Sequence, residues 1–180
     1  MATLYTVGHG ARSTEELLAV LGEAAIERLV DVRAMPRSRR HPHFGYGPLG
    51  ARLVAAGIRY DWRGEALGGL RKGGDDRRHP ALADPAFRAY AEHMEGAVFR
   101  AAAEELAERA VREKLCLMCA ERDPGRCHRL LIADWMTARG HRVVHLLAGG
   151  DERAHVLSPA VRVDGGQLRY VRGTPQRELF

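Results

Sequence analysis

Apolar and polar positions change in a regular order along the chain, and this order predicts strands that alternate with helices. Short apolar runs bounded by polar residues or glycine are typical of strands, whereas apolar residues three or four positions apart are typical of amphipathic helices. The strands are predicted at residues 4–7, 28–32, 58–62, 115–118 and 143–147. This alternation predicts an α/β fold of three layers, with a mainly parallel five-stranded sheet and helices on both of its faces.

Sequence signals at helix starts support this prediction. Ser13, with Glu16 three residues later, forms a capping box, and Asp84 is a capping residue followed by Pro85 at the first helical position. Helices are therefore predicted after Ser13, over 48–56, after Asp84, over 97–113 and from Cys127 onward.

The C-terminal part of the chain, residues 148–180, is predicted to extend the main fold. Two short apolar segments, 160–163 and 168–171, flank the turn sequence Asp164-Gly165-Gly166, which favours a small hairpin. A length of 180 residues is typical of one domain. We therefore expect a single α/β domain that ends in this hairpin.

Composition places the protein in a broad class. Its 46% apolar and 28% charged residues are ordinary for a globular protein. No apolar run is as long as a membrane span, and the N-terminus lacks the pattern of a signal peptide. Three cysteines, an odd number, argue against a disulfide framework and fit a reducing compartment. We expect a cytoplasmic protein with no membrane partner.

The net charge of +5 suggests an anionic partner. Lys72 and Lys114 are the only lysines, so nearly all of the positive charge comes from arginine. An arginine-rich composition with abundant alanine and glycine is equally expected from a GC-rich genome, so the charge alone does not decide between a binding face and genome composition. Arginine nevertheless binds phosphate and carboxylate better than lysine does, because its planar guanidinium can donate two parallel hydrogen bonds. The partner suggested by charge is an anionic small molecule or a nucleic acid, with no particular cofactor or oligomeric state indicated.

Polar residues follow three of the predicted strands at the points where the strands end. His9 follows the first strand, Asp31 and Arg33 close the second, and Cys119 and Glu121 follow the fourth. The carboxyl ends of parallel strands meet at one edge of a sheet, so these side chains are expected to converge in one cleft. Each has a structural explanation by itself, such as an Asp31–Arg33 pair or a packed cysteine. Together they favour a functional site.

The stretch from Lys114 to Arg129 is the centre of this predicted site. It contains a buried strand, a turn and the start of a helix, a combination that often binds ligands. Cys116 and Cys119 are three residues apart on the strand and should face opposite sides, which assigns Cys116 to the core. Cys119 and Cys127 are then the functional pair, expected to face one cleft.

Several chemistries are open to this pair. Cys127, at a helix N-terminus beside His128 and several arginines, is expected to be a thiolate of low pKa. It could equally form a reversible disulfide with Cys119. With His128 and His9 the two cysteines could bind zinc, but their spacing matches no common zinc pattern, and we expect no metal.

These residues support two classes of function. In the enzyme hypothesis, Cys119 or Cys127 is the nucleophile and His128 or Glu121 carries a proton, while arginines hold an anionic, nucleotide-like or phosphate-bearing substrate. In the alternative, the same arginines form a nucleic-acid or small-ligand sensor without catalysis. The candidate catalytic residues are Cys119, Cys127, His128, Glu121 and His9; the candidate ligand-binding residues are Asp31, Arg33, Arg37, Ser38, Gly68, Gly69, Tyr90 and Arg129.

Further expectations concern the surroundings of the site. Glu121 is expected to be buried and paired with Arg129 or Arg33, so that its removal damages folding. Residues 64–79 contain five glycines and predict a long surface loop or lid. Tyr90 lies at helical spacing from other apolar residues, which favours core packing, although its hydroxyl could reach the cleft.

Several motifs together resemble a known family. They are Thr6-Val7-Gly8-His9, Leu29-Val30-Asp31-Val32-Arg33 with Pro36-Arg37-Ser38, Leu67-Gly68-Gly69, Phe87-x-x-Tyr90-Ala91, and Met118-Cys119-Ala120-Glu121 leading to Cys127-His128-Arg129. Over about residues 4–147 the chain resembles the family called domain of unknown function 488. The resemblance implies the α/β fold and marks these residues as the family's signature, but it implies no reaction. The glycine-rich segment 71–76 departs from the compact connection expected there.

Overall fold

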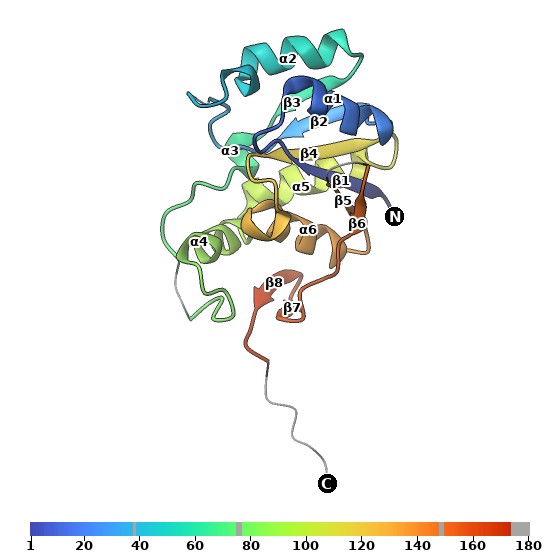
Figure 1. Ribbon diagram of the computed structural model, residues 1–180. Coiled ribbons are helices and arrows are strands. Elements are labelled where there is room, and N and C mark those ends of the chain that lie inside the picture. The colour runs from blue at the N-terminus through green and yellow to red at the C-terminus, as the bar shows by residue number, and fades with distance from the viewer. Residues whose placement is uncertain (38, 75–76, 148–149, 174–180) are drawn as a thin grey trace.

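A six-stranded sheet forms the centre of the protein, in the order β3-β2-β4-β1-β5-β6 (Figure 1). The computed structural model describes residues 1–37, 39–74, 77–147 and 150–173. The strands are β1 (Thr3–Gly8), β2 (Arg28–Asp31), β3 (Arg59–Trp62), β4 (Leu115–Cys119), β5 (Arg142–Leu146) and β6 (Glu152–Ala154). The first five are parallel, which confirms the predicted strands and their direction. The antiparallel edge strand β6 was not predicted, because its three residues are all exposed and form no apolar run.

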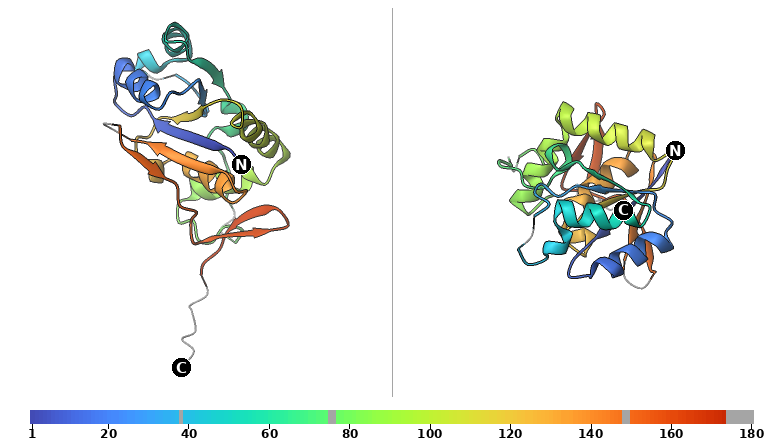
Figure 2. Two further views of the ribbon diagram at one scale, coloured as in Figure 1. Left: turned by 90° about the vertical axis from the view of Figure 1, so that its right-hand side faces the viewer. Right: turned by 90° about the horizontal axis from the view of Figure 1, so that it is seen from above.

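Helices cover both faces of the sheet, as Figure 2 shows. One face carries α1 (Thr14–Glu23) and α2 (Tyr46–Ala55), and the other carries α4 (Pro85–Met94), α5 (Ala97–Arg109) and α6 (Arg129–Thr137). Short helical turns, η1 (Pro42–Phe44), α3 (Gly64–Leu67) and η2 (Pro124–Arg126), lie in the connections. The predicted capping box of Ser13 and Glu16 is present at the start of α1, and Asp84 caps α4.

The central strand β4 is buried along its whole length and divides the core in two. Leu115 and Leu117 pack on the side of α4, α5 and α6, whereas Cys116 and Met118 pack on the side of α1 and α2. This alternation is the period-two pattern of a strand. It confirms that Cys116 belongs to the core and that Cys119 faces the other side of the sheet.

The C-terminal hairpin consists of β7 (Val161–Asp164) and β8 (Gln167–Tyr170). Gly165 and Gly166 both have positive φ, of 53° and 78°, as a two-residue turn of this kind requires. The hairpin packs on the α4–α6 side of the molecule through Val161, Leu168 and Tyr170. The predicted C-terminal hairpin is therefore confirmed.

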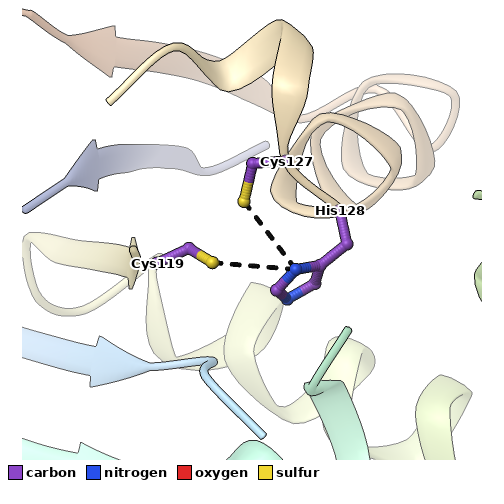
Figure 3. A group of neighbouring side chains, drawn as sticks. All are labelled: Cys119, Cys127 and His128. Atoms are coloured by element: carbon purple, nitrogen blue, oxygen red, sulfur yellow. Dashed lines mark hydrogen bonds between the residues drawn. The ribbon is translucent and has the colours of Figure 1, made fainter. Parts of the chain in front are cut away.

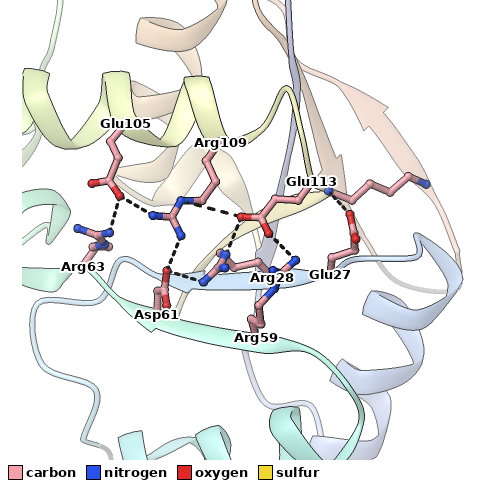
Figure 4. A network of polar contacts seen from close by, with 9 residues as sticks. Glu27, Arg28, Arg59, Asp61, Arg63, Glu105, Arg109 and Glu113 are labelled. Atoms are coloured by element: carbon pink, nitrogen blue, oxygen red, sulfur yellow. Dashed lines mark hydrogen bonds and ion pairs between the residues drawn. The ribbon is translucent and has the colours of Figure 1, made fainter.

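An ion-pair network joins β2 and β3 to α5 and to the segment that follows it (Figure 4). Arg28 pairs with Asp61 at 2.8 Å and with Glu113 at 2.7 Å, and Glu113 also pairs with Arg59 at 2.6 Å. Arg109 approaches Asp61 at 3.6 Å. These ion pairs run along β3 and tie both strands to α5 and to the segment that follows it, so they support the scaffold.

Some boundaries differ from those predicted. The helix predicted over 97–113 is α5, which ends at Arg109. The predicted lid begins with the short helix α3, which buries Leu67. Ser38 and residues 75–76, parts of the candidate site and of the glycine-rich segment, lie outside the described residues. Among the helices of the described residues, none has the length and apolar character needed to cross a membrane.

Candidate functional site

A cleft of about 780 Å³ opens at the carboxyl edge of the sheet. Its walls come from the segments that follow β1, β2 and β4, together with residues 69–70 and the start of α4. Eight of the predicted site residues line it, namely His9, Arg33, Arg37, Gly69, Cys119, Glu121, Cys127 and His128. The fold thus brings together polar residues that are up to 119 positions apart, since His128 and His9 meet in one cavity.

Two cysteines and a histidine form a cluster in this cleft (Figure 3). The sulfur atoms of Cys119 and Cys127 each lie 3.7 Å from Nδ1 of His128. All three side chains are buried, and the three donor atoms lie within 4.8 Å of one another. Both cysteines are free thiols. The predicted convergence of the two sulfurs on one cleft is therefore present.

The backbone between the two cysteines brings them together. Cys119 is the last residue of β4, as predicted, and η2 then turns the chain. The carboxylate of Asp123 accepts a hydrogen bond of 2.9 Å from the backbone N–H of Gly125 and caps this turn. Cys127 was expected to begin the next helix, but α6 begins at Arg129, with His128 as its N-cap. The correction is small and leaves Cys127 beside the free N–H groups of α6.

The imidazole of His128 is fixed from three sides. Its Nε2 lies 3.1 Å from the backbone oxygen of Val32 and donates to it, so Nδ1 carries the lone pair that faces the two sulfurs. The ring of Tyr90 packs against it at a centroid distance of 4.9 Å. Gly69 lies so close that a Cβ atom there would be 2.4 Å from Nδ1. Only glycine fits at this position.

The pKa values of the two cysteines are shifted in opposite directions. The hydrogen bond between their side chains raises the pKa of Cys119 and lowers that of Cys127. Burial raises the pKa of both thiols, but the charge and the backbone N–H of Arg129 also lower the pKa of Cys127. Cys127 is therefore the member of the cluster that carries negative charge more readily, chiefly because of the side chain of Cys119, which the sequence analysis did not consider as a cause.

Arg33 is held by Asp31, which lies behind the cleft wall and is fully buried. The guanidinium donates from Nε at 2.9 Å and from NH2 at 2.6 Å to the two oxygens of this carboxylate. Tyr60 donates to the same carboxylate at 2.7 Å, and the carbonyl of Phe44 accepts from Arg33 at 2.8 Å. Asp31 therefore positions Arg33 and does not line the cleft.

His9 lies beside Arg33 in the cleft. Its Nδ1 donates to the backbone oxygen of Gly10 at 2.9 Å, so Nε2 is the acceptor and faces NH1 of Arg33 at 3.4 Å. Burial lowers the pKa of His9 to about 4, and the nearby charge of Arg33 lowers it as well. His9 is thus a neutral base at neutral pH.

Arg129 and Glu121 do not form the predicted pair. The carboxylate of Glu121 is exposed and makes no ion pair with any other described residue, so the expectation of a buried pair with Arg129 or Arg33 was wrong. Arg129 is 1% exposed and donates instead to the backbone oxygens of Glu121 and Arg122. The guanidinium therefore fastens the loop through its backbone.

Three further arginines face the cleft with their charges available. Arg37, Arg40 and Arg126 are exposed lining residues, and the side chains of these three form no ion pair or hydrogen bond within the described part of the chain. Exposed Met35 and Leu70 line the same cleft and give it an apolar lip. The cleft therefore combines cationic forks with apolar surface.

The remaining predicted site residues lie behind the lining. Tyr90 is fully buried and donates its hydroxyl to the backbone oxygen of Leu67 at 2.8 Å, so the hydroxyl does not reach the cleft. Gly68 is also buried and, like Arg129, is not among the lining residues. Sequence reasoning missed Arg126 and the apolar lip. The position of Arg126 beside Cys127 was a signal for it, whereas nothing local distinguished the lip from ordinary loop residues.

A family model described as domain of unknown function DUF488 matches residues 13–136. The matched span covers more than half of the chain and runs from the start of α1 almost to the end of α6. It includes the Cys119–Cys127–His128 cluster and Arg33, while His9 precedes it. Comparison with curated proteins and with solved structures finds no match.

Proposed function

The chain belongs to the DUF488 family, whose description assigns no reaction, and we propose that it is an enzyme acting on an anionic, phosphate-bearing small molecule. The observation that carries this proposal is a buried Cys/Cys/His cluster in a cleft that three unpaired arginines line. Arg37, Arg40 and Arg126 would hold the anionic group, since guanidinium forks bind phosphate well.

The cluster would supply the reactive centre. Nδ1 of His128 and the two sulfurs lie at one place in the cleft, and Glu121 lines the same cavity as a carboxylate able to carry a proton. Neutral His9, beside Arg33, is a second group able to exchange a proton with a bound substrate. The reaction class that fits is group transfer or hydrolysis.

The size of the cleft favours a small molecule over a nucleic acid. Pockets for small ligands usually measure about 300–1,000 Å³, and this cleft measures about 780 Å³. The apolar lip of Met35 and Leu70 suits a flat apolar group attached to the anion, as in a nucleotide. A cytoplasmic location is part of the proposal, because three free thiols are typical of a reducing compartment.

Titration with inorganic pyrophosphate and with nucleoside monophosphates tests the substrate class. We expect Arg37→Ala and Arg126→Ala each to weaken binding about tenfold, because each removes one charge-assisted contact. Arg100→Ala is the matched control, since Arg100 is exposed on α5 and does not line the cleft. Equal affinity of all three variants for these anions contradicts the proposal.

Turnover separates an enzyme from a sensor. If the protein converts phosphate esters, Cys127→Ser should abolish conversion and leave anion binding within about twofold of the parent, because the arginines remain. If Cys127→Ser and the parent bind alike and neither converts any ester in a broad panel, the sensor alternative holds and the enzyme proposal is rejected.

A further inference from the structure

Three atoms able to bind a metal ion lie close together in the described structure. They are the sulfurs of Cys119 and Cys127 and Nδ1 of His128, which Figure 3 shows turned toward one another. We propose that these three atoms bind a thiophilic divalent cation of the zinc type, with a fourth coordination position open to the cleft. This inference goes beyond the proposed function and does not depend on an anionic substrate.

The distances fit a tetrahedral ion. With Zn–S bonds of about 2.3 Å and Zn–N bonds of about 2.0–2.1 Å, neighbouring sulfur and nitrogen ligands of a tetrahedron lie about 3.6 Å apart. Both sulfur–Nδ1 distances here are 3.7 Å, and all three atoms lie within 4.8 Å of one another. An ion could therefore enter with only small side-chain movements.

The orientation of His128 also fits a ligand. A metal-bound histidine usually donates its other ring N–H to a carbonyl or carboxylate, which fixes the tautomer. Here Nε2 donates to the backbone oxygen of Val32 at 3.1 Å, and Nδ1 keeps its lone pair. Tyr90 and Gly69 hold the ring in this orientation from the sides.

Hydrogen bonding alone leaves the cluster poorly satisfied. Nδ1 has one lone pair and can accept from only one of the two thiols that stand 3.7 Å from it, so the other thiol has only the neighbouring sulfur, a weak acceptor, as its partner. A cation would bind all three atoms at once. Two thiolates would neutralise a divalent ion, so the buried site would carry no net charge of its own.

The environment indicates a site with an open position. Structural zinc sites usually have four protein ligands, whereas catalytic sites have three and leave the fourth position to water or substrate. The three donors face a cleft of about 780 Å³ that Glu121 and His9 also line. Water or a substrate oxygen could therefore occupy the fourth position, within a cavity that holds a carboxylate and a neutral imidazole.

The loop that holds the donors is well fastened. Arg129 binds the backbone oxygens of Glu121 and Arg122, and the capped turn at Asp123 fixes the path to Cys127. A loop held through its own backbone keeps the two sulfurs in place before a metal arrives. Such preorganisation lowers the cost of binding.

Titration of the metal-free full chain with Co²⁺ alone tests this site. We expect one equivalent per chain to give thiolate-to-cobalt charge-transfer absorption together with the visible bands of tetrahedral cobalt, and Zn²⁺ to displace it. Cys119→Ser and Cys127→Ser should each weaken binding at least 100-fold and lose much of the charge-transfer band. Cys116→Ala is the matched control, because Cys116 lies in the core on the other face of the sheet and should leave the titration unchanged.

Alkylation of the unmutated protein provides a second measurement that needs no variant to fold. Zn²⁺ should protect Cys119 and Cys127, identified by peptide mass, and leave the reactivity of Cys116 as it was. The proposal is overturned if Co²⁺ produces no thiolate band at one equivalent, or if Zn²⁺ changes the alkylation of neither cysteine. Anion binding without metal binding would reject this site alone, and metal binding without anion affinity would reject only the proposed substrate class.

Discussion

At the scale of single residues, the site depends on one close approach of backbone to side chain. Gly69 passes over the imidazole of His128, where a Cβ atom would lie 2.4 Å from Nδ1 and 2.8 Å from the neighbouring ring carbon. The ring cannot move away freely, because Val32 accepts from its Nε2 and Tyr90 packs against it. The identity of residue 69 is thus set by the position of His128.

Gly69→Ala is therefore expected to destabilise the protein by about 1–3 kcal/mol, since it overpacks a fixed site. The added methyl group should also displace Nδ1 from the two sulfurs and change the alkylation rate of Cys127. Urea unfolding and thiol mapping measure the two effects.

Gly22→Ala is the matched control for this substitution. Gly22 lies in α1, is exposed, and has no atom within 4 Å of an added Cβ. Because alanine is the better helix former, this variant should be more stable than the parent by about 0.5–1 kcal/mol. If Gly69→Ala behaves like Gly22→Ala, the close approach does not constrain residue 69.

At the scale of elements, the connection from β4 to α6 is held by the side chain of Arg129, which donates hydrogen bonds to backbone carbonyl groups. Arg129 donates to the carbonyls of Glu121 and Arg122, while Gly8 of β1 allows this loop to approach, since a Cβ there would lie 1.8 Å from the oxygen of Glu121. The loop is thus fixed by backbone contacts to both neighbouring elements. The side chain of Glu121 remains free for the cleft.

This arrangement predicts opposite results for two substitutions in the same loop. Arg129→Ala should cost about 2–4 kcal/mol, because it removes a buried side chain and leaves two partly buried carbonyl groups without their donor. Glu121→Ala should change the free energy of unfolding by no more than about 0.5 kcal/mol, because its side chain is exposed. Thermal and urea unfolding measure both, and a large loss in Glu121→Ala with none in Arg129→Ala would contradict this assignment.

At the scale of the whole molecule, a buried chain of hydrogen bonds joins the sheet to the C-terminal hairpin. Thr6 of β1 bonds to His145 of β5 at 2.7 Å, and His145 bonds to His155 at 3.0 Å. His155 then meets Asp134 of α6 at 3.0 Å, and the same carboxylate accepts from Tyr170 at 2.8 Å. The extension after β5 is therefore connected to the core by polar contacts as well as by apolar packing.

This series of hydrogen bonds makes the free energy of unfolding depend on pH. Burial lowers the pKa of His145 to about 4, with a further contribution from His155. Between pH 6.5 and 4 the unfolded state takes up a proton that the folded state does not, so stability falls as the pH falls through this range. The loss attributable to His145 is on the order of 3 kcal/mol by pH 4.

Urea unfolding across this pH range, for the parent and for His145→Asn, measures the effect. The variant should be less stable at pH 7, and its stability should depend on pH by about one proton less than that of the parent. His9, whose pKa is also lowered to about 4, leaves a residual slope in both proteins. Parallel curves for the two proteins would exclude His145 as the source.

The sequence determined the elements of this protein because their signals are local. The apolar run of β4, the capping box of α1 and the Gly165–Gly166 turn each depend on residues within a few positions of one another. The same local periodicity placed Cys116 and Cys119 on opposite faces of the sheet, and the parallel order of the strands predicted a cleft at their carboxyl ends.

Only the tertiary structure decided how the site is assembled, because its contacts join residues far apart in the chain. His128 owes its orientation to Val32, 96 positions away, and to Gly69. Arg129 was expected to pair with the nearby carboxylate of Glu121. Its buried side chain instead donates to the backbone oxygens of Glu121 and Arg122. A local pattern specifies which chemical groups reach the edge of the sheet, whereas packing between distant elements determines which of those groups pair and which remain free to bind a ligand.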